Sequence, residues 1–147
     1  MITTRKATDD DKPFLWKLKV ASLRPYVAQI YGWDEPTQYG YFENGFHPSA
    51  IQIIQYDGQN VGMYELQESV KSWFLAVIMV LPEFQNKGIG STIIQRMIDD
   101  IAVSNKPLRL QVFKVNPARR LYERLGFVKL GESKTHIQME MSNERID

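Results

Sequence analysis

The sequence predicts an α/β protein with a mixed, mostly antiparallel central sheet of about six to seven strands and helices on both faces. Three observations predict it. Three strand-like segments follow one another between residues 50 and 81, which is typical of antiparallel neighbours. The last of these, 73–81, is apolar on both faces, as in a strand covered from both sides. After it, strand-like and helix-like segments alternate to the end of the chain.

The composition is that of an ordinary globular protein, with 44% hydrophobic and 24% charged residues among 147. This length fits one domain, so we predict a single domain over 1–147. No cysteine is present, which excludes disulfides, thiolate zinc sites and a cysteine nucleophile. His47 and His136 cannot form a histidine-rich metal site alone, and no metal is expected.

The charge and hydropathy patterns narrow the class of partner and the location. A formal net charge of +1 does not favour a nucleic acid or an anionic membrane as partner. No apolar run reaches the length of about 20 residues that a transmembrane helix needs. The charged start of the chain lacks the apolar stretch of a signal peptide. We therefore predict a cytoplasmic protein without a membrane partner.

The first third of the chain predicts a short strand and two helices. Residues 2–7 suit the strand, Thr8 can cap the helix that follows, and three aspartates suit the positive end of its dipole. Pro25 is expected to break or restart this helix. A second, short helix is predicted over 37–43.

Aromatic residues are concentrated between positions 26 and 46. They are Tyr26, Tyr31, Trp33, Tyr39, Tyr41, Phe42 and Phe46. Packing within the core or a lid is one interpretation, and lining of a substrate cleft is the other. Within this segment Trp33-Asp34-Glu35 suggests a substrate wall that offers a carboxylate to a cationic amine, so Tyr31, Trp33 and Glu35 are candidate substrate-binding residues.

The rest of the chain alternates between predicted strands and helices. Strands are expected over 50–56, 61–68 and 72–81, with a turn at 57–60. A helix over 90–103 carries an isoleucine-rich stripe on one side and polar residues on the other. A strand at 108–113, a helix that starts near Pro117 and ends at Gly126, and a hairpin of 127–130 with 135–141 complete the chain.

The loop between the apolar strand and the isoleucine-striped helix is the segment that predicts chemistry. The first turn of a helix has unpaired N–H groups and the positive end of the dipole, which together attract an anion such as pyrophosphate. Gly88 and Gly90 leave the backbone accessible, and Lys87 adds positive charge. A simple tight turn is the alternative interpretation. The nucleotide-triphosphate loop and the dinucleotide fingerprint are excluded, because Lys87 precedes Gly88 and position 93 is isoleucine.

Two motifs resemble those of a known family. Gln85-x-x-Gly88-x-Gly90, after an apolar strand and Pro82, resembles the acyl-CoA signature of the GCN5-related N-acetyltransferases (GNAT). The run Asn116-Pro117-Ala118-Arg119-Arg120-Leu121-Tyr122 and onward to Gly126-Phe127 resembles the second motif of that family. The opening residues 5–11 resemble its usual first strand and helix start, whereas 26–46 is the region where such enzymes differ.

The resemblance implies a GNAT-like acyl-CoA N-acyltransferase fold and activity. Acetyl-CoA would be the cosubstrate, and an acetyl group would pass to a primary amine of a small molecule by direct attack in a ternary complex. The residues implied in coenzyme binding are Ile78 and Val80 through their backbone, the loop Gln85, Asn86, Lys87, Gly88, Ile89, Gly90 and Ser91, then Asn116 and Arg119. The resemblance also makes a homodimer conceivable.

The resemblance assigns Tyr122 to protonating the departing thiolate, and phenol is a feasible acid for a thiolate. Several groups are candidates for accepting the proton of the amine. Some members carry a glutamate eleven residues before the motif glutamine, where this chain has Phe74. Glu65 on the preceding strand is the preferred substitute and Glu68 a weaker one, and a water chain or a backbone carbonyl is a further alternative. His136 is expected to be a packed or exposed strand histidine.

Two other functions stay open at this point. One is acetylation of a peptide or protein N-terminus, which requires an open groove between the aromatic segment and the closing hairpin. The other is a non-catalytic acyl-CoA-binding sensor. The residues Asn116 and Tyr122 count against a sensor, whereas Phe74 in place of a carboxylate counts for it.

Overall fold

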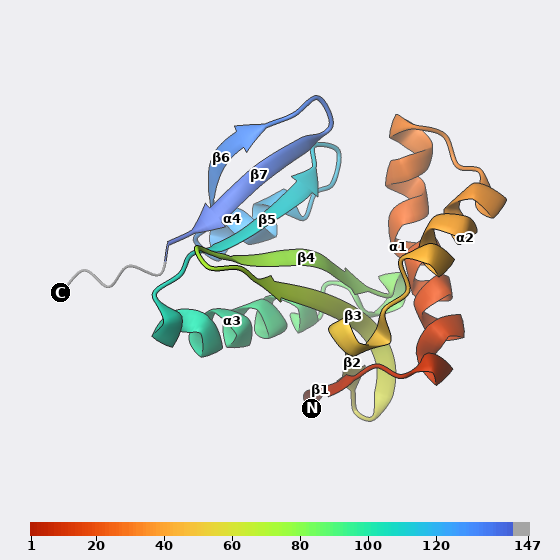
Figure 1. Cartoon of the computed structure of the whole chain (residues 1–147), viewed down its shortest axis with the longest axis horizontal. Coiled ribbons are helices and arrows are strands. Elements are labelled where there is room, and N and C mark those ends of the chain that lie inside the picture. Colours follow the sequence, from red (N-terminus) through yellow and green to blue (C-terminus); the bar gives the residue numbers. More distant parts are fainter. Residues whose placement is uncertain (143–147) are drawn as a thin grey trace. The chain divides into compact units, whose positions relative to one another are not determined.

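The computed structural model describes residues 1–142, which form two compact units. The first unit comprises Met1–Glu65 and Val77–Lys87, and the second comprises Leu66–Ala76 and the chain from Gly88 on. Strands β3 (Gln59–Glu68) and β4 (Trp73–Val80) each continue from one unit into the other. The seven strands have the order β1-β2-β3-β4-β5-β7-β6 (Figure 1). The predicted class, a mixed sheet with helices, is confirmed.

An antiparallel ladder of β1 (Ile2–Lys6), β2 (Gln52–Tyr56) and β3 forms the base of the first unit. The turn from β2 to β3 has two residues, Asp57 and Gly58, with φ of 50° and 83°. Positive φ at both central residues is the tight hairpin turn that matches strand twist. The predicted turn at 57–60 therefore holds β2 and β3 in register.

Strand β3 comes very close to β4 at Gly62. A β-carbon built on Gly62 would lie 2.4 Å from the carbonyl oxygen of Met79, closer than any real contact. Glycine is required here because the two backbones approach each other directly.

The start of helix α1 (Lys12–Ile30) is held by one buried carboxylate. Asp11 is 6% exposed, accepts a 2.8 Å bond from the Thr8 N–H, and accepts 2.9 and 2.7 Å bonds from the Arg5 guanidinium. These bonds lower the pKa of Asp11, with the Arg5 bond as the main cause. The contact ties β1 to the beginning of α1.

The expected break at Pro25 is wrong, because α1 continues through Pro25 to Ile30. Proline inside a helix removes one hydrogen bond and crowds the preceding turn, which costs about 3 kcal/mol. Leu15, Leu18 and Val27 are buried along this helix on both sides of the proline. Their packing keeps the segment helical against the local preference.

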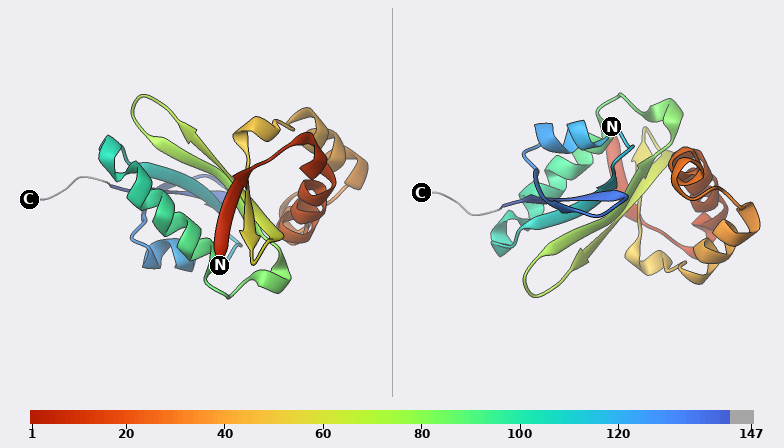
Figure 2. Two further views of the ribbon diagram at one scale, coloured as in Figure 1. Left: turned by 90° about the horizontal axis from the view of Figure 1, so that it is seen from below. Right: turned by 90° about the horizontal axis from the view of Figure 1, so that it is seen from above.

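Helix α2 (Glu35–Asn44) lies beside α1 in the first unit and includes the predicted short helix (Figure 2). Asp34 caps it by accepting bonds from the Thr37 N–H, at 3.2 Å, and from the Thr37 hydroxyl. Helix α1, the strands β2, β3 and β4, and residues next to β1, β2 and β4 supply a buried cluster. Its members are Ala7, Leu15, Leu18, Ile51, Ile53, Met63, Met79 and Leu81.

The second unit has a parallel pair and an antiparallel hairpin. The first residues of β4, Trp73–Leu75, pair in parallel with Leu108–Leu110 of β5 (Leu108–Phe113). Strand β7 (His136–Met141) pairs antiparallel with β5 and with β6 (Val128–Glu132). The parallel pair makes the sheet mixed, as predicted.

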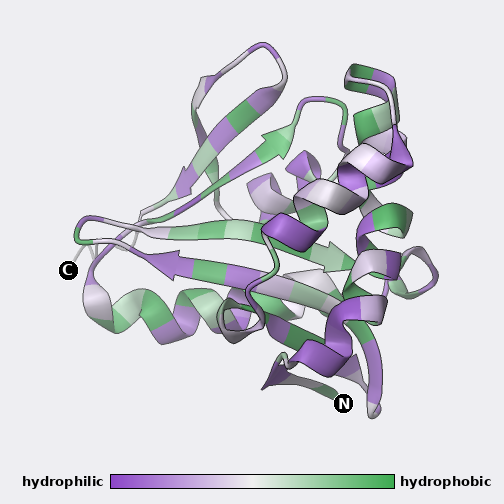
Figure 3. Ribbon diagram, turned by 45° about the vertical axis from the view of Figure 1, so that its right-hand side comes forward, coloured by the Kyte–Doolittle hydropathy of each residue, from purple (hydrophilic) through white to green (hydrophobic). Residues whose placement is uncertain are grey.

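Two helices belong to this unit. Helix α3 (Ile89–Ile101) has an apolar stripe against the unit's interior and a polar side, visible as alternating colours in Figure 3. Its buried residues are Ile89, Ile93, Ile94, Met97 and Ile101. Helix α4 (Arg119–Arg124) is short and buries Tyr122, and Gly126 follows it with φ of 105°. Both helices lie where the sequence predicted a helix.

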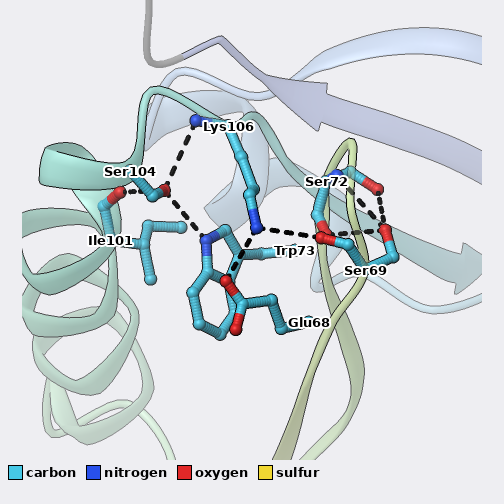
Figure 4. Close-up of polar contacts among 7 residues, drawn as sticks. All are labelled: Glu68, Ser69, Ser72, Trp73, Ile101, Ser104 and Lys106. Carbon is cyan, nitrogen blue, oxygen red and sulfur yellow. Dashed lines mark hydrogen bonds and ion pairs between the residues drawn. The ribbon is translucent and has the colours of Figure 1, made fainter.

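A polar network joins the turn between β3 and β4 to the segment after α3 (Figure 4). The ammonium of Lys106 donates to Glu68 at 2.7 Å and to the Ser69 carbonyl at 3.0 Å, and lies over the Trp73 ring. The Trp73 indole N–H donates to Ser104 at 3.0 Å. Glu68 is therefore paired with a lysine in the described structure.

No helix within residues 1–142 has the length and apolar character needed to cross a membrane.

Candidate functional site

The loop after β4 is fixed at its beginning by two hydrogen bonds and a short helical turn within the first unit. The Leu81 N–H donates to the Val61 carbonyl at 2.8 Å, and a short 3-10 turn, Pro82–Phe84, follows. The side chain of Gln85 then turns back, and its Nε2 donates to the Val80 carbonyl at 3.0 Å. The motif glutamine thus holds the shape of the loop, a role that the spacing of the motif did not reveal.

The loop reaches α3 through two residues with left-handed backbones, Asn86 (φ 62°) and Gly88 (φ 77°). Asparagine and glycine are the residues that adopt this conformation most easily. Lys87 lies exposed between them, and within residues 1–142 its ammonium has no partner. The loop therefore brings a cation close to the start of α3.

The start of α3 leaves three backbone donors ahead of the first helical hydrogen bond. That bond runs from the Thr92 N–H to the Gly88 carbonyl at 3.0 Å. The N–H groups of Ile89, Gly90 and Ser91 come before it, and a helix has no internal acceptor for such groups. These N–H groups are the ones at which the sequence predicts an anion socket, and the binding of an anion there stays a prediction.

The side chains around this socket keep it open. Ile89 is buried and anchors the first turn, and the Ser91 hydroxyl folds onto the Gly88 carbonyl at 3.1 Å. A β-carbon on Gly90 would meet Leu121 of α4 at 3.9 Å, an ordinary contact. The start of α3 and helix α4 are therefore neighbours within the second unit.

The segment before α4 uses its polar groups to build the helix start. Asn116 Oδ1 accepts a 2.9 Å bond from the Ala118 N–H, and the Asn116 N–H donates to the Phe113 carbonyl at 2.9 Å. Arg119 pairs with Glu123 at 2.7 Å on the helix surface. Asn116 and Arg119 therefore lie next to the helical turn that carries Tyr122. The Oδ1 atom of Asn116 and the Nε atom of Arg119 already have hydrogen-bond partners within the chain.

Tyr122 is 8% exposed, and its ring packs edge-on against Phe127 with ring centres 6.0 Å apart. Burial raises the pKa of Tyr122 to about 12, because the phenolate would be poorly solvated. The phenol is therefore protonated at any physiological pH. It can donate a proton but cannot serve as a base.

Four predicted or discussed positions lie on the two strands that pass through both units. Ile78 and Val80 are half-buried on the first-unit part of β4, and Phe74 is half-buried on the second-unit part, opposite Arg109 of β5. Glu65 is half-buried on β3 and already interacts with a neighbour. The structure thus confirms the element that carries each residue, while their roles remain predictions.

The proposed substrate wall is changed by the structure in one respect. The carboxylate of Asp34 caps α2. Of the two neighbouring acids, Glu35 is therefore the candidate for contact with a cationic amine, and its side chain is exposed in the first turn of the helix. Trp33 stacks on Trp16 with ring centres 6.4 Å apart, and Tyr31 is 63% exposed. Trp16 also contacts Tyr39 edge-on at 4.9 Å. Part of the aromatic segment is therefore packing, as the first interpretation held.

Comparison with known proteins identifies the family of the chain. The family model described as an acetyltransferase (GNAT) domain matches residues 47–129, more than half of the chain. The chain belongs to this family, and the protein is an N-acetyltransferase of the GNAT class. The predicted resemblance is confirmed.

Individual relatives resemble the whole chain. The 5-NmdU N-acetyltransferase of Pseudomonas phage PaMx11 is 29% identical over 137 residues, which cover 90% of this chain and 91% of that protein. The PaiA N-acetyltransferase from Thermoplasma acidophilum, solved in complex with coenzyme A, superposes with a TM-score of 0.79 at 18% identity, over 97% of this chain and 99% of that one. The ribosomal-protein-S18-alanine N-acetyltransferase from Escherichia coli superposes with a TM-score of 0.71 at 20% identity, over 100% of this chain and 97% of that one.

Proposed function

We propose that the protein transfers an acetyl group from acetyl-CoA to a primary amine of a small molecule, by direct attack in a ternary complex. One observation carries the proposal: the start of α3 presents the N–H groups of Ile89, Gly90 and Ser91 next to α4, which holds a buried, protonated tyrosine. Donors for a pyrophosphate and a proton donor for a thiolate thus occur in one unit.

The residues present fit a coenzyme A diphosphate. The socket has backbone donors, no side chain at Gly88 or Gly90 to cover them, and Lys87 beside it. An open groove continues from the socket along the solvent side of α3, and we propose it for the nucleotide end of the coenzyme. It is lined by Ser91, Thr92, Gln95, Arg96, Asp99 and Leu125. Ile78 and Val80 would bind the pantetheine arm through their backbone, with Asn116 and Arg119 as further contacts.

When bound, acetyl-CoA supplies an activated acetyl thioester. Tyr122 holds its proton at neutral pH and delivers it to the sulfur that leaves. We keep Glu65 as the carboxylate candidate for taking the proton of the amine. Tyr31, Trp33 and Glu35 are proposed to contact the acceptor, with Glu35 attracting its positive charge.

The relatives suggest which acceptors to test first. The printed activity of the phage relative, a 5-NmdU N-acetyltransferase, makes 5-NmdU the first small-molecule acceptor. The E. coli structure, a ribosomal-protein-S18-alanine N-acetyltransferase, supports a peptide N-terminus as the second candidate.

The test is release of coenzyme A thiol from acetyl-CoA with 5-NmdU, a panel of metabolite amines and short peptides. Turnover with a small amine at a kcat/KM above that of every peptide supports the proposal. Turnover with peptides alone would replace the small-molecule substrate. Binding of acetyl-CoA without turnover on any acceptor would favour the non-catalytic sensor.

A further inference from the structure

Helix α1 carries a tryptophan, Trp16, whose ring contacts aromatic residues of α2 and of the segment before α2. The Trp16 ring lies edge-on to Tyr39 with ring centres 4.9 Å apart, is tilted against Phe42 at 5.4 Å, and stacks on Trp33 at 6.4 Å. All four residues belong to the first unit. We call Trp16, Trp33 and Tyr39 the aromatic triad.

The aromatic residues of this unit fall into a core part and an exposed part. Phe42 and Phe46 pack against the buried cluster of the first unit, with ring centres 5.8 Å apart. Tyr39, by contrast, is 38% exposed, and Trp16 and Trp33 are half-buried. The aromatic triad therefore keeps ring surface in contact with solvent. Accessible aromatic rings bind other planar rings by stacking.

A lysine ammonium lies beside the aromatic triad. Lys19 follows Trp16 by one helical turn, on the same side of α1. Its side chain is half-buried, and its Nζ donates a long, 3.5 Å hydrogen bond to the Gln38 carbonyl. Gln38 precedes Tyr39 in α2, so the ammonium ends at the helical turn that carries Tyr39. Burial lowers the pKa of Lys19, because the charged form has lost part of its water.

This ammonium has no carboxylate partner within residues 1–142. Lys12, on the same helix, lies 3.9 Å from the carboxylate of Glu43 in α2, whereas Lys19 faces a backbone carbonyl of α2. A partly buried charge without a counter-ion is unfavourable, and an anion bound beside it offsets the lost hydration. Lys19 is therefore placed to bind an anionic group of a ligand.

We propose that α1 and α2 select an acceptor amine that carries a planar aromatic ring and an anionic group, a carboxylate or a phosphate. The ring stacks on Trp16 and Tyr39, and the anionic group binds the Lys19 ammonium. The inference rests on the proposed acetyl transfer and deepens it, because Trp33 of the aromatic triad is already a proposed acceptor contact. Trp16 and Lys19 thus become specificity-determining residues.

The two charges of such an acceptor have separate partners on these helices. Glu35 lies four residues before Tyr39 in α2, and residues at this spacing lie on one side of a helix. Its exposed carboxylate is the proposed partner of the ammonium end. The Lys19 ammonium, beside Tyr39, is the partner of the anionic end. An acceptor with opposite charges at its two ends complements this arrangement.

The first test measures binding without acetyl transfer. The ¹⁵N-labelled protein, loaded with coenzyme A, is titrated with 4-(aminomethyl)benzoate, and the indole N–H signals of the three tryptophans are followed. We expect saturable shifts for Trp16 and Trp33. Trp73, whose indole N–H donates to Ser104 in the second unit, should keep its position.

Matched amines separate the contribution of the ring from that of the charge. 4-Methylbenzylamine lacks the carboxylate, and trans-4-(aminomethyl)cyclohexanecarboxylate lacks the aromatic ring. Each should bind about 5-fold more weakly than 4-(aminomethyl)benzoate. 4-(Aminomethyl)phenylphosphonate places a phosphate-like group at the same position, and the tighter of the two anionic aromatic amines identifies the preferred anion.

Lys19→Met removes the charge and keeps an unbranched side chain. It should weaken binding of the anionic aromatic amines by about 10-fold and leave 4-methylbenzylamine unchanged. Lys17→Met is the matched control, because Lys17 is an exposed lysine on the same helix, and it should bind every amine as the wild type does. Tyr39→Leu should remove the preference for the aromatic ring over the cyclohexane ring.

The outcomes distinguish this inference from the proposed function. Equal losses in Lys19→Met and Lys17→Met would overturn the role of Lys19, and absence of a saturable Trp16 shift with all four amines would overturn the site. Lys19-dependent binding without thiol release on any amine would support the site and contradict the transfer. Thiol release that is faster with amines lacking a ring or an anion would overturn the inference and leave the transfer intact.

Discussion

At the residue scale, Tyr122 shows how burial selects a chemical role. Its hydroxyl belongs to a side chain that is 8% exposed, and the low polarity of that environment raises the pKa to about 12. A tyrosine on the surface would exchange protons with water as readily as with a ligand. The buried phenol stays protonated at neutral pH, so that it carries a proton at the moment when the coenzyme A sulfur would leave.

Tyr122→Phe removes the proton and keeps the ring that packs on Phe127. We expect kcat to fall by about 10²-fold or more, with acetyl-CoA affinity and thermal stability close to wild type. Wild-type kcat should also show no alkaline fall in the ordinary assay range, because the phenol stays protonated there. Steady-state thiol release from pH 6 to 10 measures both. An unchanged kcat at every pH would remove the acid role from Tyr122.

The protonation of Asp11 affects the folding stability of the first unit. Arg5 lowers its pKa in the folded state, whereas an unfolded aspartate titrates near 3.9. A lowered folded pKa contributes stability that is present above the unfolded pKa and is lost as pH falls through the folded pKa. The contribution of Asp11 should therefore be full at neutral pH and should vanish in strong acid.

Asp11→Asn should lower the free energy of unfolding by about 1–3 kcal/mol at pH 7, because it breaks a charge-assisted pair with Arg5. The difference from wild type should shrink below about pH 4. Urea denaturation across this pH range measures it, with the exposed neighbour Asp10→Asn as control. Equal destabilisation at pH 3 and pH 7 would contradict the assignment.

At the element scale, the start of α3 is shaped by two glycines with different tasks. Gly88 has a φ of 77°, which other residues adopt only with strain, whereas Gly90 is helical and has only Leu121 near its missing β-carbon. The first glycine therefore serves the shape of the loop, and the second serves access to the amides.

This difference can be measured with two alanine variants. Gly88→Ala should lower the free energy of unfolding by about 1–2 kcal/mol. Gly90→Ala should leave it unchanged or raise it by about 0.5–1 kcal/mol, and should weaken acetyl-CoA binding, because a side chain at this position reduces the space for a ligand to approach the backbone. Calorimetric titration and urea denaturation give the two quantities. Wild-type affinity in Gly90→Ala would count against the socket.

The approach of β3 to β4 is another element-scale constraint. Gly62→Ala would place a β-carbon 2.4 Å from the Met79 carbonyl, and a backbone atom cannot move aside as a side chain can. We expect a loss of about 3 kcal/mol in the free energy of unfolding. Gly131→Ala on β6 is the control, because its β-carbon would lie 3.8 Å from Gln138. Equal stability of the two variants would show that β3 and β4 are not this close.

The sequence predicted the elements well where the local pattern and the tertiary structure agree. The predicted isoleucine-rich stripe of α3 matches the burial of this helix closely, since it comes from one face being packed. The predicted helix break at Pro25 was wrong, because the packing of buried residues on both sides of the proline overrides its local tendency to end a helix. The sequence around Asp34 and Gln85 did not reveal that these side chains form hydrogen bonds with nearby backbone groups of the chain rather than with a ligand.

At the scale of the whole molecule, the candidate site residues are distributed over both units. The second unit alone contains the start of α3, Asn116, Tyr122 and His136, whereas the first contains the aromatic segment with Tyr31 and Trp33. The sequence could predict where the glycine loop and the start of α3 lie, because both are local in the chain. It could not predict the Phe113–His136 stack, which depends on the register of β5 with β7.

The central claim is that the backbone amides at the start of α3 bind the diphosphate of coenzyme A. Its most direct test is a titration of the ¹⁵N-labelled protein with coenzyme A, followed through the amide signals. We predict saturable shifts for Ile89, Gly90 and Ser91, while Thr37, at the start of α2, keeps its position because Asp34 already binds its N–H. Saturable binding that leaves the three α3 signals unmoved would contradict the claim.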